Sequence, residues 1–124
     1  TVQDILSFTS CHPYYTQQLA FQVWNMLERQ EPEANIVQHA VEELTQLHDF
    51  DYERMWMAMN KTDRHILMLL TQKGKSPFNA QRGIPTSTVF SALKRLSRQG
   101  YVIKNESYEI DDPFFSRWIY NRSL

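Results

Sequence analysis

The sequence predicts a mainly α-helical protein with one small β-hairpin, organised as two modules. Apolar residues recur with helical spacing through most of the 124 residues, and two short β-runs around a polar turn occur only at 101–110. Residues 1–60 carry two cations and nine carboxylates, hence −7, whereas residues 61–124 carry eleven cations and five carboxylates, hence +6. This change of sign predicts two modules, the second with an anionic partner or an acidic neighbour.

The first half predicts a small helical bundle of about four helices, at 2–10, 12–30, 31–48 and 49–60. Pro13 occupies the favoured first position of the second helix. In the third helix the outward positions belong to Glu42, Glu43 and Gln46. The helical period assigns the following residues to the core: Leu19, Val23, Trp24, Leu27, Ile36, Val37, Ala40, Val41, Leu44, Leu47, Tyr52, Met55, Trp56 and Met59.

The second half predicts a different order of elements. A helix capped by Asn60 or Thr62 ends at Gly74, a short helix or turn follows at 77–83, and a further helix runs from Pro85 and Thr86 to Gly100. The β-runs 101–104 and 108–110 form a hairpin.

A terminal helix follows the hairpin, with Asp111 or Asp112 as its cap and Pro113 at its first position. Phe114, Phe115 and Trp118 are expected to close the core. This order of elements is that of a winged helix-turn-helix, so we expect a helical module at 1–58 and a winged helix at 59–124.

The helix at 84–100 has two faces of different chemistry. Val89, Ala92, Leu93 and Leu96 share an apolar face, and Phe90 lies at its border. Short hydroxyls near the amino end and cations further along suit a helix that enters the DNA major groove. Together with two residues at the wing tip, the predicted DNA-binding residues are Thr86, Ser87, Thr88, Ser91, Lys94, Arg95, Arg98, Lys104 and Asn105.

Two readings of this basic face remain open. In the first, it binds double-stranded DNA. In the second, the winged helix is a protein-docking or autoinhibitory module whose basic face meets acidic protein surface, such as the first module or a further domain. The charge asymmetry supports both readings equally, and plain solvation of the face is a third.

Two stretches of the sequence resemble motifs of a known family. The stretch SCHPYYTQQLAFQVWNML resembles the HPYYTQ helix in the carboxy-terminal lid of AAA+ ATPases of the archaeal-ATPase type, close to the STAND class. The stretch from MNKTDRHILMLL to the terminal DPFFSRW resembles the winged-helix domain that follows that lid. Together these stretches cover almost the whole chain, in the family's order.

The resemblance implies a lid and a winged helix of a larger ATPase, whose amino-terminal core binds ATP or ADP with Mg²⁺. It places His12, Pro13 and Tyr14 nearest the nucleotide, where a helix amino terminus favours phosphate. Cys11 replaces the family's usual glycine, and Tyr14 stands where many AAA+ proteins have a sensing arginine, which argues against a charge-based sensor. The alternative is that His12, Tyr14 and Tyr15 only pack the lid.

Other features limit the function of this chain. It has no G-x-x-x-x-G-K-[ST] phosphate loop, so we expect no ATP hydrolysis by the chain alone, no catalytic residue and no metal or other cofactor of its own. Cys11 is the only cysteine, and no apolar run is long enough to span a bilayer, so we expect a cytoplasmic protein without a membrane partner. The start at Thr1 without methionine suggests a piece of a longer protein.

Overall fold

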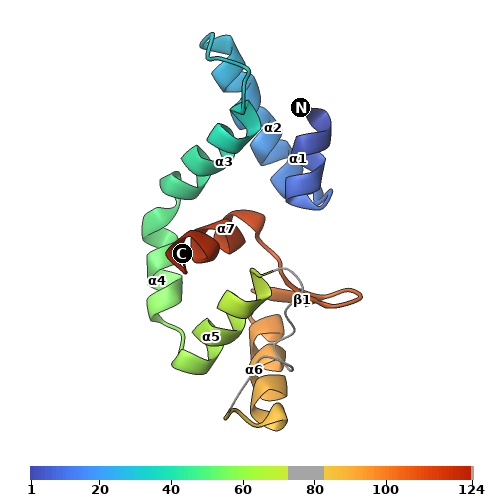
Figure 1. Cartoon of the computed structure of the whole chain (residues 1–124), viewed down its shortest axis with the longest axis vertical. Helices are drawn as coiled ribbons and strands as arrows, with labels where there is room; N and C mark the ends of the chain where they lie inside the picture. The colour runs from blue at the N-terminus through green and yellow to red at the C-terminus, as the bar shows by residue number, and fades with distance from the viewer. Residues whose placement is uncertain (73–82, 124) are drawn as a thin grey trace. The chain divides into compact units, whose positions relative to one another are not determined.

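The computed structural model describes residues 1–72 and 83–123 and divides the chain into two compact units. Figure 1 shows a mainly helical chain with one small hairpin, as the sequence predicted. The described elements are α1 (Val2–Thr9), α2 (Pro13–Glu28), α3 (Ile36–Leu47), α4 (Asp49–Met57), α5 (Lys61–Leu70), α6 (Thr86–Arg98), β1 (Val102–Lys104), β2 (Tyr108–Ile110) and α7 (Pro113–Arg122).

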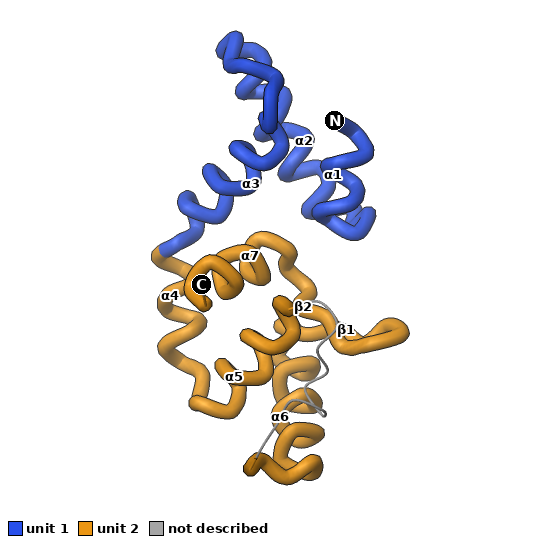
Figure 2. The backbone as a smooth tube through the Cα atoms, in the orientation of Figure 1, with its two compact units in different colours: residues 1–49 blue, residues 50–124 orange. Residues whose placement is uncertain are grey.

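Unit 1 comprises residues 1–49 and is built on the packing of α2 against both α1 and α3 (Figure 2). Pro13 is the first residue of α2, as predicted. The core of unit 1 is mostly aliphatic, because each helix turns one apolar face inward. The buried apolar side chains are Ile5, Leu19, Val23, Met26, Ile36, Ala40, Val41 and Leu44, and Thr9 and Thr45 are buried with them.

Four predicted core residues of unit 1 are not buried: three are exposed, and Val37 is half-buried, as is Met55 in unit 2. Trp24 is 56% exposed and Leu27 is also exposed, whereas Met26 is buried in their place. Trp24 lies about 140° around the helix from Leu19, so the helical period itself turns it outward. Leu47 has the right period, yet it is exposed because the last turn of α3 lies away from α1 and α2 (Figure 2).

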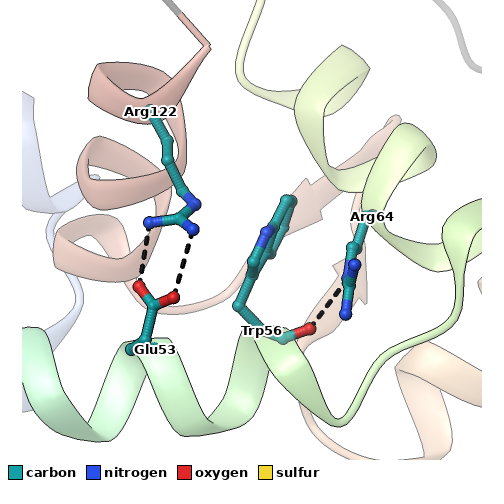
Figure 3. Close-up of polar contacts among 4 residues, drawn as sticks. All are labelled: Glu53, Trp56, Arg64 and Arg122. Carbon is teal, nitrogen blue, oxygen red and sulfur yellow. Dashed lines mark hydrogen bonds and ion pairs between the residues drawn. The ribbon is translucent and has the colours of Figure 1, made fainter.

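The boundary between the units lies between Asp49 and Phe50, whereas the sequence placed it near residue 58. Nearly all of α4 therefore belongs with the winged helix. Figure 3 shows two of the contacts that fix it there: Arg122 of α7 donates to both carboxylate oxygens of Glu53, at 2.8 and 3.1 Å, and Arg64 of α5 donates to the Trp56 carbonyl at 2.9 Å.

Aromatic packing joins α4 to α7 within unit 2. The Tyr52 ring lies 5.1 Å from Phe115, and the Trp56 ring lies 6.0 Å from Trp118, between ring centroids. The Tyr52 hydroxyl also donates to Asp112 at 3.0 Å. Periodicity predicted that Tyr52 and Trp56 are buried, but it could not show that α7 is what buries them.

The rest of unit 2 follows the predicted winged-helix order. Asn60 caps α5 by accepting from the Asp63 N–H at 2.8 Å, and Asp112 caps α7 by accepting from the Phe114 N–H at 2.9 Å. The helix α5 ends at Leu70, before the predicted stop at Gly74, which lies outside the described residues. The predicted short helix or turn at 77–83 also lies outside them, except for Gly83.

The loop end of the hairpin projects from the helices (Figure 1), whereas β1 contacts α6 and β2 contacts α5 and α7. The strands pair antiparallel with Val102 opposite Ile110. Gly100 ends α6 with φ +86°, a left-handed conformation that glycine adopts without strain. The Tyr101 N–H then donates to the Leu96 carbonyl at 3.0 Å, so the chain turns directly from α6 into β1. Phe114, Phe115 and Trp118 are buried and close the core, as predicted.

Candidate nucleic-acid interface

The helix α6 separates an apolar face from a polar one. Val89, Ala92, Leu93 and Leu96 are buried, and the helix contacts α5 and β1. Of the predicted outward residues, Arg95 is half-buried. The others are exposed: Thr86, Ser87, Thr88, Ser91, Lys94 and Arg98. The assignment of the two faces from the sequence is confirmed, because burial of four apolar side chains fixes the rotation of the helix about its axis.

Lys94 and Arg98 are the cations that this face offers to solvent. They are four residues apart, hence on neighbouring turns of the same side of α6. Within residues 1–72 and 83–123 neither forms an ion pair. No carboxylate in the described part of the chain compensates their charge, so a phosphate group could meet it without displacing one of those carboxylates.

Arg95 differs from these two cations because it already has a carboxylate partner. One of its Nη atoms donates to Asp63 Oδ1, and the Arg95 side chain is 41% exposed whereas that of Asp63 is only 7% exposed. Asp63 lies in the first turn of α5, where its backbone N–H donates to the Asn60 cap. The buried carboxylate thus holds the guanidinium against the start of α5.

No sequence pattern indicated this pair. Arg95 and Asp63 are 32 residues apart, and Asp63 was visible only as an acidic residue in the first turn of a helix. Helix packing brings them together. The consequence for the site is that Arg95 contributes little free positive charge, although its type and position suggested a backbone cation.

A polar groove lies where the start of α5 meets the outward face of α6. It has a volume of about 310 Å³. The helix α6 contributes short hydroxyls and the Arg95 side chain, and α5 contributes an amide and a further hydroxyl. The lining residues are Asn60, Thr62, Ser87, Thr88, Ser91 and Arg95. Asn60 and Thr62 were considered in the sequence only as helix caps, so their place beside the predicted DNA-binding residues is new.

Phe90 also belongs to the outward side of α6. The sequence placed it at the border of the two faces, and the structure leaves it 53% exposed. It lies one turn before Lys94. The face therefore combines hydroxyls, cations and one aromatic ring.

The wing residues Lys104 and Asn105 are both exposed on the hairpin. The Lys104 ammonium lies 5.2 Å from the Tyr108 ring centroid, and the Asn105 N–H donates to the Ser107 carbonyl at 3.0 Å. These contacts shape the wing tip. No described contact links either side chain to the outward face of α6, so the structure places the wing residues in the same unit but not in the groove.

The three nucleotide-sensing candidates lie in unit 1, at the start of α2. His12 is the N-cap and Tyr14 is exposed. The His12 ring lies 4.6 Å from Tyr15, between centroids, and its buried Nδ1 meets no hydrogen-bonding partner among the described residues. An orphaned nitrogen at a helix amino terminus is compatible with a phosphate, although the first turn of α2 carries no cation.

No described group of three His, Cys, Asp or Glu side chains could hold a metal ion, and none of the described helices is long and apolar enough to cross a membrane. Comparison with protein-family models, curated proteins and solved structures gave no match.

Proposed function

We propose that unit 2 binds double-stranded DNA, with α6 in the major groove and the hairpin as a wing on the adjoining backbone. The observation that carries the proposal is the outward face of α6, where Lys94 and Arg98 are exposed and have no described ion-pair partner while hydroxyls occupy the amino-terminal turns. Phosphates take contacts from cations and hydroxyls, and short side chains let a helix approach the base edges.

The charge balance of the two units is compatible with this proposal and indicates which unit would meet DNA. Residues 1–49 carry one cation and seven carboxylates, hence −6, and residues 50–124 carry twelve cations and seven carboxylates, hence +5. Release of counterions from DNA favours binding by the cationic second unit, whereas phosphates repel the acidic first unit. DNA should therefore meet unit 2.

The test compares two double variants of equal charge change. Lys94→Ala/Arg98→Ala removes the free cations of α6, and Arg29→Ala/Arg54→Ala removes two exposed cations elsewhere. Fluorescence anisotropy with a labelled random-sequence duplex at low salt should show a loss on the order of tenfold or more for the first variant only. Equal affinities of the wild type and both variants would overturn the proposal, and circular dichroism would verify that all three are folded.

For unit 1 we propose a lid role in a larger AAA+/STAND-type ATPase, following the resemblance of the HPYYTQ word. On this proposal the amino-terminal ATPase core of the same polypeptide binds ATP or ADP with Mg²⁺, and the start of α2 (His12, Pro13, Tyr14) faces the nucleotide. The lid couples nucleotide state to the winged helix. The present chain has no phosphate loop of its own and is proposed to hydrolyse no ATP.

A second candidate function, protein docking, is favoured by a specific observation. Along α2 the aromatic side chains Tyr14, Phe21 and Trp24 are all exposed, and the Phe21 and Trp24 rings stack at 6.4 Å. Aromatic residues of this kind are enriched at protein interfaces. These aromatic residues lie in unit 1, so protein docking by unit 1 is compatible with DNA binding by unit 2. Protein docking would become the main proposal if the DNA-binding test failed.

A further inference from the structure

The pair formed by Arg95 and Asp63 differs from every other part of the proposed DNA-binding face. A buried carboxylate is costly unless it is paired, and here its partner is a half-exposed arginine on the face itself. The Asn60 cap fixes the backbone of Asp63. The guanidinium therefore has a set position, whereas Lys94 and Arg98 have exposed side chains that are free to follow a phosphate.

Charge shows what Arg95 is poorly suited to do. The Asp63 carboxylate neutralises it locally, so the pair adds almost nothing to the attraction of phosphates. A guanidinium carries five N–H donors in a planar fork, however, and one of its Nη atoms suffices for the contact with Asp63 Oδ1. The exposed remainder of the fork keeps its directional hydrogen-bonding capacity without its long-range field.

Apart from Arg95 itself, the side chains that line the groove are neutral. Apart from Arg95, the groove is lined by the hydroxyls of Ser87, Thr88, Ser91 and Thr62 and the amide of Asn60. Its volume of about 310 Å³ is roughly ten times the ~30 Å³ share of one water molecule in the liquid. Short side chains around an oriented fork let the helix approach closely enough for the fork to reach a base edge.

We propose that Arg95 reads guanine in the major groove and that Asp63 is the residue that positions it. Guanine presents two adjacent acceptors there, N7 and O6, which match two N–H groups of an arginine fork. Asp63 touches no DNA on this proposal and acts through Arg95 alone. The inference rests on the proposed function, since it requires that α6 enter the major groove.

The test uses the whole chain and two pools of labelled duplex of equal length and composition. In one pool every guanine is replaced by 7-deazaguanine, which keeps O6 but lacks the N7 acceptor. The wild type should bind the ordinary pool several-fold more tightly, since each good bidentate pair discriminates by roughly fivefold or more. The phosphate backbone is the same in both pools, so a phosphate contact cannot produce this difference.

Two variants separate positioning from charge and from stability. Arg95→Lys keeps the positive charge but lacks the planar fork, so it should discriminate between the pools clearly less than the wild type and keep the salt dependence of the wild type. Asp63→Asn should also lose the discrimination, and its salt dependence should become slightly steeper because Arg95 is released toward phosphates. A merely structural role of Asp63 would weaken binding to both pools alike.

The outcomes distinguish this inference from the proposed function. Equal binding of the two pools by the wild type, with steep salt dependence, would overturn guanine reading and leave DNA binding intact. Failure of the wild type to bind either pool would overturn both. If Asp63→Asn does not fold, Arg95→Lys still decides the question, because it leaves a cation beside the buried carboxylate.

Discussion

The helices α2 and α6 solve the same packing problem and present opposite chemistry to solvent. Each buries an apolar face in its own unit, α2 through Leu19, Val23 and Met26 and α6 through Val89, Ala92, Leu93 and Leu96. The outward face of α2 exposes Phe21 and Trp24, whereas that of α6 exposes hydroxyls, Lys94 and Arg98. The buried faces determine the fold, and on our proposals the outward faces meet different partners, protein for α2 and DNA for α6.

The largest expected effect separates a buried aromatic residue from an exposed one. Phe115 is buried and its ring lies within 6.1 Å of the rings of Tyr52, Tyr101 and Trp118, between centroids. Phe115→Ala should lower the free energy of unfolding by about 3–5 kcal/mol, because it leaves a cavity in the core of unit 2. Chemical denaturation monitored by circular dichroism measures the change.

Trp24→Ala is the matched experiment in unit 1. It removes an even larger ring, yet Trp24 is exposed, so the free energy of unfolding should change by no more than about 0.5 kcal/mol. A loss comparable to that of Phe115→Ala would show that Trp24 is buried in solution, and the distinction between the two outward faces would then fail.

A smaller effect concerns the ends of the two helices, which use the same turn with different residues. Gly100 follows α6 with φ +86°, and Gln30 follows α2 with φ +60°. A residue other than glycine pays roughly 1 kcal/mol in this conformation. Gly100→Ala should therefore destabilise the protein by about that amount, and Gln30→Gly should stabilise it by roughly 0.5–1 kcal/mol.

Thermal unfolding of both variants would check the signs. A Cβ atom at Gly100 would meet nothing within 4 Å, so steric clash cannot explain a loss there. If Gly100→Ala were neutral, backbone strain would not be what selects glycine at the end of α6.

Much of the fold could be predicted because it depends on signals between neighbouring residues. Asn60, Asp112, Pro13 and Gly100 mark helix ends through their own backbone or side-chain chemistry, and the apolar face of α6 follows from its period alone. These signals need only neighbouring residues. The same signals produced the correct order of the elements that the structure describes in unit 2.

The remainder depends on contacts between distant segments. The period of α4 shows that Tyr52 and Trp56 are buried, but not that they pack against α7 in unit 2. Within the candidate site, the exposed hydroxyls and cations were predicted from the sequence, whereas the ion pair between Arg95 and Asp63 was not. Pairing across 32 residues leaves no trace in spacing, so one of the three predicted cations of α6 changes its expected role.

The salt dependence of DNA binding tests the central claim most directly. Affinity of the wild type for a random duplex, measured from about 50 to 200 mM salt, should fall linearly in a double-logarithmic plot. Lys94→Ala/Arg98→Ala should reduce the magnitude of that slope by about 2, and Arg29→Ala/Arg54→Ala should leave it unchanged. A slope near zero, or no binding at the lowest salt, would contradict the account and leave the basic face of α6 as a surface for protein.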